Sequence, residues 1–123
     1  MRTVRTDKLN KDMLELIEYH LPGRSEDTIS WYENFKHDTV LFYDEDNVLD
    51  GMLSYFILDF KFDTIIAMQR GNIFYKDMWR ILKDTIANKV KPLRIMSDPS
   101  NKVLVKGAER HKGVWHQDEI WFY

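Results

Sequence analysis

A segment rich in lysine and arginine is the part of the sequence best suited to bind a charged partner. Residues 89–113 carry seven basic and two acidic side chains, although the whole chain has 18 basic against 20 acidic residues and a net charge of −2. A local positive patch on an acidic body attracts phosphate groups, so the segment predicts a phosphate-bearing partner. The alternative is that these charges only keep a helix face in water.

Other chemistries lack the residues that they need. The chain has no cysteine, which excludes a disulfide scaffold and a cysteine-based zinc site. Neither His-x-His nor His-x-x-x-His occurs among its four histidines, so we predict no metal site. The sequence contains no Gly-x-Ser-x-Gly nucleophile motif and no Walker phosphate loop.

Length and composition indicate one globular domain over residues 1–123. Hydrophobic residues make up 44% of the chain and aromatic residues 14%, which is enough for a core and too much for a disordered protein. No apolar run is long enough to cross a membrane, and the N-terminal residues lack the apolar core of a signal peptide. We therefore expect a cytoplasmic protein without a membrane partner.

The first half of the chain predicts a strand, two helices and three further strands. Residues 2–6 alternate weakly, as a short strand does, and an amphipathic helix follows that ends at Pro22-Gly23. The apolar stripe of this helix consists of Leu9, Met13, Leu16, Ile17 and His20. A second helix is expected over 25–35 and strands over 40–43, 49–62 and 64–68. The last strand is apolar on both faces, which is typical of a central strand.

The second half predicts helices that alternate with strands. We expect a helix from Phe74 to residue 88, a strand over 92–96, a helix over 102–111 and a closing strand over 119–123. Gly107 weakens the last helix, and Gly113 marks its end. The order β-α-α-β-β-β-α-β-α-β requires crossovers, so we predict an α/β fold with a mixed sheet of about six strands and helices on both faces.

This order of elements resembles the GNAT superfamily of acyl-coenzyme-A-dependent N-acyltransferases, and the resemblance covers essentially the whole chain. In that family a strand, two helices and a three-strand meander precede a pyrophosphate-binding loop and a long helix. Most members have a seventh strand, whereas this chain is expected to stop after the sixth. Its compact size also resembles small GNAT-like proteins encoded by bacteriophages, which would place it in the host cytoplasm or the virion.

The resemblance implies an acetyl-CoA site at Met68-Gln69-Arg70-Gly71-Asn72. The family loop has the pattern Gln/Arg-x-x-Gly-x-Gly/Ala, in which N–H groups cradle the pyrophosphate and glycines let it approach the main chain. Arg70-Gly71 fits its start, and the later glycines are absent. Asn101 fits a second family position, and together with the basic fourth helix it would contact the pantetheine and 3′-phosphate. The alternative for Gly71 is a plain strand-to-helix turn.

The resemblance also implies two catalytic residues. The family base is commonly a carboxylate near the start of the fourth strand, and Asp63 is the nearest match. Ser97 ends the fifth strand and could donate a hydrogen bond near the thioester. The family's tyrosine acid has no counterpart, since its position falls on Ala108 or Glu109. The alternatives are that Asp63 begins a hairpin turn and that Ser97 belongs to an ordinary turn.

Two functions follow from the resemblance. The first is transfer of an acetyl or acyl group from acyl-CoA to an amine on a small molecule or a protein. The second is a catalytically inactive binding or assembly protein that contacts a protein or nucleic acid through residues 89–113, in a virion or in host takeover. An open slot between the fourth and fifth strands favours the first function, and closure by Met68, Met96 or Phe74 favours the second. The surplus of methionine and aromatic residues also allows a homodimer patch.

Three aromatic residues near the basic segment have two interpretations. Beside arginine and lysine, Trp115, Trp121 and Tyr123 could stack nucleic-acid bases, as in a small nucleic-acid-binding domain. The alternative is that they pack a C-terminal strand onto the sheet.

Overall fold

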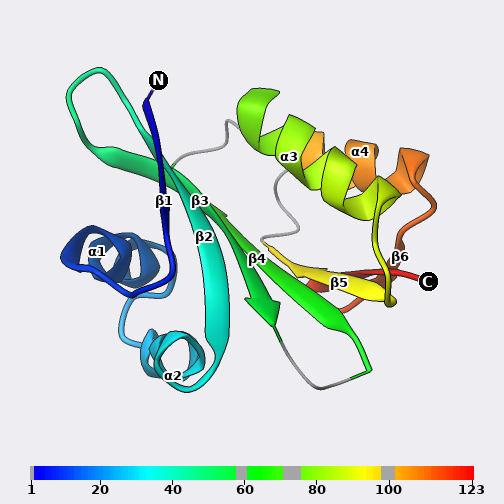
Figure 1. The fold of residues 1–123 in the computed structure, drawn as a ribbon, viewed down its shortest axis with the longest axis horizontal. Coiled ribbons are helices and arrows are strands. Elements are labelled where there is room, and N and C mark those ends of the chain that lie inside the picture. The colour runs from blue at the N-terminus through cyan, green and yellow to red at the C-terminus, as the bar shows by residue number, and fades with distance from the viewer. Residues whose placement is uncertain (1, 58–60, 71–75, 98–101) are drawn as a thin grey trace.

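The computed structural model describes residues 2–57, 61–70, 76–97 and 102–123 (Figure 1). Its elements are β1 (Arg2–Thr6), α1 (Lys11–His20), α2 (Glu26–Asn34), β2 (Lys36–Tyr43), β3 (Leu49–Ile57), β4 (Asp63–Gln69), α3 (Lys76–Ala87), β5 (Leu93–Met96), α4 (Lys102–Arg110), β6 (Val114–His116) and β7 (Glu119–Phe122). The strands form one sheet in the order β1-β2-β3-β4-β5-β7-β6. β4 and β5 pair in parallel and the other neighbours in antiparallel fashion, so the predicted mixed α/β fold is confirmed.

The sheet has seven strands in the part of the chain that the structure describes, so the expected number of about six was too low. The additional strand is β6, which pairs in antiparallel fashion with β7. A turn joins the two strands, and in it Gln117 has a φ of 58°. β6 has only three residues, too few to show the alternation of apolar and polar side chains that reveals a strand. β7 lies between β5 and β6, so the hairpin completes the sheet beyond β5.

Each face of the sheet packs against one pair of helices. α3 and α4 cover one face, where Ile65 and Ala67 of β4 join a hydrophobic cluster that we call the α3/α4 cluster. α1 and α2 cover the other, where Ile66 and Met68 join the α1/α2 cluster. Figure 1 shows the two helix pairs on opposite sides of the sheet. All of β4 is buried, as its apolar sequence predicts for a central strand.

Two glycines of the C-terminal half are required by close packing. A Cβ atom on Gly107 would lie 2.3 Å from a ring atom of Trp79, so α3 and α4 approach each other through this position. A Cβ atom on Gly113 would lie 2.6 Å from the Ile120 Cγ2 atom. The left-handed residue after α4 is Lys112, with a φ of 62°, so Gly113 is needed for space and not for the helix end.

No helix within the described part of the chain has both the length and the apolar character needed to cross a membrane.

Candidate functional site

β4 continues past the end of its parallel neighbour. The pairing of β4 with β5 ends at Ile66 and Met96, whereas β4 runs on to Gln69. Ser97 follows the last pair, and its N–H donates to the Asp118 C=O in the β6–β7 turn at 3.5 Å. The carboxyl ends of β4 and β5 and the β6–β7 turn therefore meet at one edge of the sheet.

The backbone of Gln69 points toward the side of β5. At the start of β4, the Asp63 N–H donates to the Pro92 C=O just before β5, at 3.0 Å. After its end, the Arg70 N–H donates to the Asp50 C=O of β3, at 2.7 Å. Backbone groups alternate in direction along a strand, so Gln69, like Asp63, faces away from β3. The described part of β5 ends too early to pair with it.

The imidazole of His20 lies at this edge. Its Nε2 accepts a hydrogen bond from the Gln69 N–H at 2.8 Å and also contacts the Gln69 C=O. Nε2 therefore lies against both backbone groups of Gln69, and the tautomer of the ring decides whether it accepts from the N–H or donates to the C=O. α1 positions the ring, because Leu16 and Ile17 anchor its last turn in the α1/α2 cluster and His20 follows on the same face.

Arg70 is fixed beside the same edge. Its Nε donates to the Leu49 C=O at 3.0 Å, and its guanidinium carbon lies 4.9 Å from the centre of the Tyr19 ring. Leu49 begins β3 next to a bulge, where the β2–β3 register passes from Leu49 directly to Gly51. Burial and the nearby Asp44 raise the pKa of Asp50, and Arg70 opposes that shift. The arginine thus places a positive charge where β4 ends.

The side-chain amide of Gln69 is buried without a hydrogen-bond partner among the described residues. Gln69 is 6% exposed, and the alternation along β4 puts its side chain on the same face as Ile65 and Ala67. Leaving a buried amide without a partner costs about 1–3 kcal/mol. Such a group in a folded protein calls for a ligand or a water molecule.

Asp63 lies at the opposite end of the same strand. β4 has seven residues, which separates Asp63 from Gln69 by about 20 Å along the strand. The Asp63 carboxylate accepts a hydrogen bond from the Tyr55 hydroxyl, and Lys91 Nζ lies 3.9 Å away. Burial and this hydrogen bond raise the pKa of Tyr55 to about 12. The structure therefore does not bring Asp63 together with Met68, Gln69 and Arg70 at the other end of the strand.

Several solved structures are similar to this chain over nearly its whole length, and two of them are named as acetyltransferases. No protein-family model and no curated protein matches the sequence. A GNAT-family acetyltransferase from Staphylococcus aureus matches over 98% of both chains, with a TM-score of 0.61 and 9% identity. The chain has the GNAT fold. A Bacillus subtilis acetyltransferase in complex with CoA matches over 98% of this chain and 97% of its own, with a TM-score of 0.60 and 11% identity. Tetrahymena GCN5 matches over 91% and 84%, with a TM-score of 0.57 and 12% identity.

Within this GNAT fold, several of the predicted site residues gather at one edge. Gln69, Arg70 and Ser97 lie at the carboxyl ends of β4 and β5, together with Met68. Met68 is buried in the α1/α2 cluster, and Met96 packs against that cluster from β5. The other predicted positions, Gly71, Asn72, Phe74 and Asn101, lie outside the described residues.

Sequence reasoning missed His20 as part of this edge. The periodicity placed it in the apolar stripe of a helix and gave it no further role. The only signal was a polar ring among apolar residues, which by itself does not reveal a strand 49 positions later in the chain.

The basic segment divides into two parts. Lys102, Lys106 and Arg110 are exposed at four-residue spacing on α4, so they form one basic stripe. Arg94 instead donates to the Thr64 hydroxyl at 2.7 Å, and Lys91 approaches Asp63. The α4 stripe is therefore the part of the segment that is most open to a phosphate-bearing partner.

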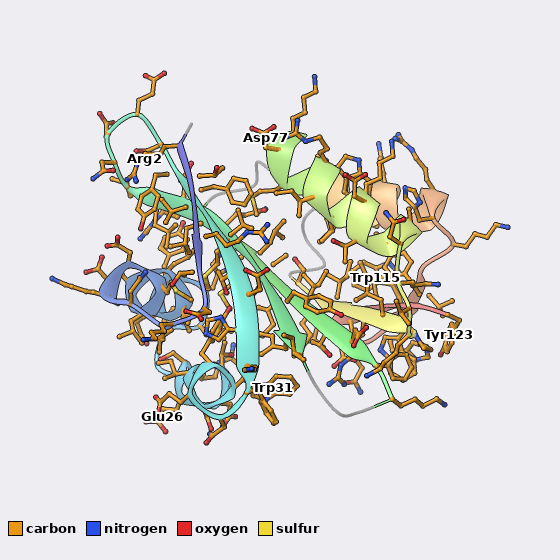
Figure 2. All side chains as sticks on the ribbon, viewed as in Figure 1. Arg2, Glu26, Trp31, Asp77, Trp115 and Tyr123 are labelled. Carbon is orange, nitrogen blue, oxygen red and sulfur yellow. The ribbon has the colours of Figure 1, made fainter. Side chains whose placement is uncertain are left out.

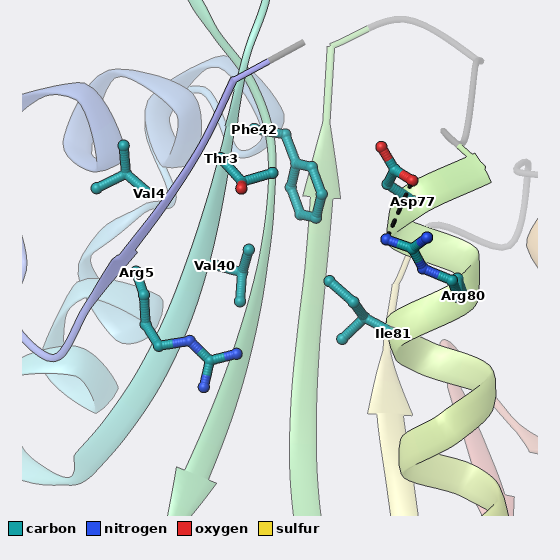
Figure 3. Close-up of a pocket in the computed structure, with 8 residues that line it drawn as sticks. All are labelled: Thr3, Val4, Arg5, Val40, Phe42, Asp77, Arg80 and Ile81. Atoms are coloured by element: carbon teal, nitrogen blue, oxygen red, sulfur yellow. Dashed lines mark ion pairs between the residues drawn. The ribbon is translucent and has the colours of Figure 1, made fainter.

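Two further features of the described residues do not form a site. A cavity of about 290 Å³ between β1, β2 and α3 is lined by none of the predicted site residues, and its Arg80 pairs with Asp77 at 3.3 Å (Figure 3).

No group of three histidine, aspartate or glutamate side chains in the described ranges could hold a metal ion.

A buried polar chain holds α2 on the sheet. The Tyr32 hydroxyl lies 2.6 Å from Ser54 Oγ, which accepts from the Thr39 hydroxyl at 2.9 Å, and His37 Nδ1 lies 2.9 Å from the same hydroxyl. Burial lowers the pKa of His37 and raises that of Tyr32. These four side chains are hydrogen-bond partners of one another, so we assign this buried network a structural role.

Proposed function

We propose that the protein transfers an acyl group from acyl-CoA to an amine and binds the coenzyme at the carboxyl end of β4. The observation that carries the proposal is the Gln69 backbone, which faces the side of β5 beyond the point where β5 pairs. Two of the solved structures with this fold are named as acetyltransferases, and one of these is in complex with CoA.

The residues at this edge suit the chemistry of the coenzyme. The pantetheine arm contains amide groups, which can pair with the Gln69 N–H and C=O as a neighbouring strand would. The buried Gln69 side-chain amide supplies a further donor and acceptor, and Arg70 supplies positive charge for a phosphate. Gly71, Asn72 and Asn101 would complete the contacts to the pyrophosphate and pantetheine, and the basic stripe of α4 would contact the 3′-phosphate.

His20 and Ser97 each have a task in this reaction. His20 must release the Gln69 N–H before a ligand amide can pair with it. Ser97 would donate a hydrogen bond near the reacting group. The bound acyl-CoA supplies the activated thioester, and holding it against the amine supplies much of the rate. A role of Asp63 as the base stays a prediction, and Asp63→Asn with measured turnover tests it.

Thermal unfolding with and without CoA tests the proposal. A ligand that binds only the folded state raises the midpoint, so millimolar acetyl-CoA and CoA should both shift it upward. Gln69→Leu should reduce the shift, whereas Ile57→Glu should leave it unchanged, because Ile57 is exposed and lies at the opposite end of β3 from Gly51, the register partner of Gln69. Absence of a shift in the wild type, confirmed by calorimetric titration, would reject the proposal. A confirmed shift leads to a screen of amines by release of the coenzyme thiol.

A second candidate is a GNAT-fold binding protein without catalysis. It is favoured by His20, which occupies the edge of β4, and by Met68 and Met96, which pack beside it. The α4 stripe would then contact a protein or nucleic acid. Coenzyme binding should be absent in that case, and Lys106→Glu should abolish capture of the partner. A cytoplasmic location and a bacteriophage source stay predictions.

A further inference from the structure

One half of one sheet face is not covered by a described helix. The α1/α2 cluster draws its residues from α1, α2, β1 to β4 and Met96 of β5, and includes no described residue of β6 or β7. Figure 1 likewise shows α1 and α2 beside β1 to β4, away from β5 and the C-terminal strands. The face of β7 and β6 on this side therefore has no partner among the described helices, whereas β5 contacts the α1/α2 layer through Met96 and through Arg94, which lies 5.6 Å from the Trp31 ring of α2.

Aromatic side chains fill this uncovered face. Trp121 of β7 stacks on His116 of β6 with ring centres 3.9 Å apart, and packs against Phe62 at 4.8 Å and Tyr123 at 6.1 Å. Arg94 of β5 is the register partner of Trp121. We call these five residues, Phe62, Arg94, His116, Trp121 and Tyr123, the aromatic strip. Trp115 lies on the opposite face and packs against the α3/α4 cluster.

The strip has the composition of a protein–protein interface. Interface cores are enriched in tryptophan, tyrosine, phenylalanine and arginine, and these residues contribute most of the binding energy. Tyr123 is 64% exposed, and Figure 2 shows it at the rim of the molecule. Arg94 is held by Thr64 and lies 5.6 Å from the ring of Trp31, so its side chain is already ordered. An ordered aromatic surface loses little entropy on binding.

Charges of opposite sign lie at the two ends of the strip. At one end, the Glu119 carboxylate accepts from the Trp121 indole N–H at 2.8 Å, and Asp118 precedes it. At the other, Lys61 Nζ lies 5.9 Å from the centre of the Phe62 ring. The length of β7 separates these ends by about 13 Å. A nucleic acid backbone would meet the Glu119 carboxylate, which repels phosphate.

We infer that two copies of the chain associate through the aromatic strip. In a two-fold dimer the same patch contacts itself in antiparallel orientation, so the Glu119 end of one copy lies on the Lys61 end of the other. The arrangement pairs the opposite charges and buries Trp121, Phe62 and Tyr123 of both copies. Gln69, Arg70 and the α4 stripe are not part of the strip, and the association needs no coenzyme, so the inference does not depend on the proposed function.

Sedimentation across a range of protein concentrations tests the association. The wild type should pass from monomer to dimer as the concentration rises through the micromolar range. Tyr123→Glu should weaken the dimer by about tenfold or more, because it removes an exposed aromatic ring and places a charge beside Phe62 and Trp121. Val103→Glu is the matched control, since it changes an exposed valine on α4, and it should have no effect.

Charge reversal tests the orientation of the two copies. Lys61→Glu and Glu119→Lys should each weaken the dimer, because like charges then face each other. The double variant restores opposite charges, so its dissociation constant should return to within about threefold of the wild type. Thermal unfolding of every variant checks that it folds.

Three outcomes would overturn the inference. The first is a wild type that stays monomeric at the highest concentration. The second is a dimer that is insensitive to the strip variants. The third is a monomer that binds single-stranded DNA or RNA, with affinity that falls steeply with salt and is lost in Tyr123→Glu, because the strip would then serve nucleic acid.

Discussion

The two ends of β4 are equally buried and differ in their hydrogen-bond partners. Asp63 at the start is 8% exposed, and Gln69 at the end is 6% exposed. The Asp63 side chain binds Tyr55 and Lys91, and its N–H pairs toward β5. The Gln69 side chain has no hydrogen-bond partner among the described residues. Its backbone N–H donates to the His20 ring and not to a neighbouring strand. Burial alone therefore does not separate a structural polar residue from a candidate ligand contact, whereas the pattern of partners does.

Removal of Asp63 should have the largest effect on stability. Asp63→Ala removes the acceptor of the buried Tyr55 hydroxyl and the carboxylate beside Lys91, so we expect the free energy of unfolding to fall by about 2 kcal/mol. Urea denaturation measures this change. Coenzyme affinity should stay within error of the wild type, since the substitution is far from Gln69. If the Asp63→Ala variant is as stable as the wild type and binds the coenzyme more weakly, Asp63 and not Gln69 is the residue of β4 that contacts the coenzyme.

Replacement of Gln69 should lower the affinity for the coenzyme and leave the stability of the fold intact. Gln69→Leu exchanges a buried amide without a partner for an apolar side chain of similar size, so stability should stay equal or rise by up to about 1 kcal/mol. The affinity for CoA should fall by about tenfold, which calorimetric titration measures. A marked loss of stability would mean that the amide is already satisfied, and would remove one support of the proposed site.

The free energy of unfolding at alkaline pH tests the environment of Tyr55, which lies beside Asp63 at the start of β4. The pKa of Tyr55 is raised from 10.0 to about 12, so the folded state keeps a proton that the unfolded state loses. Tyr55 therefore contributes stability below about pH 10 that is lost as the pH rises toward 12. The free energy of unfolding should fall less steeply across this range in Tyr55→Phe than in the wild type. Identical slopes would contradict the hydrogen bond to Asp63.

Removal of His20 should produce the smallest change, and it acts on coenzyme binding. His20→Ala frees the Gln69 N–H for a ligand amide, so CoA should bind about threefold more tightly. The exposed Glu15 on the same helix provides the control, and Glu15→Ala should have no effect. Weaker binding by His20→Ala, with an unchanged unfolding midpoint, would mean that the imidazole contacts the coenzyme itself.

The fold was predictable because its main signals are local. The strand apolar on both faces at 64–68 marks the centre of the sheet, and the amphipathic stripes mark helices that cover each face. β6 was not predictable, since three residues hold too little pattern. The need for Gly107 was also hidden, because it arises from Trp79 on another helix.

The candidate site was predictable only in part. The residue types at Gln69 and Arg70 drew attention to the end of β4, and the structure adds that Ser97 ends the neighbouring strand at the same edge. The contact of His20 with Gln69 depends on how α1 packs across the sheet, and no local pattern reports that packing. The partners of Asp63 come from β3 and from the turn before β5, so the position of Asp63 in a hairpin of the sequence did not reveal them.

Nuclear magnetic resonance of the labelled protein during titration with CoA tests the central claim most directly. The account predicts that the Gln69 backbone amide and the His20 ring shift together as the coenzyme takes the edge of β4, while the Asp63 amide at the other end stays in place. A saturating titration in which Gln69 and His20 do not move, or a spectrum that CoA leaves unchanged throughout, would contradict it.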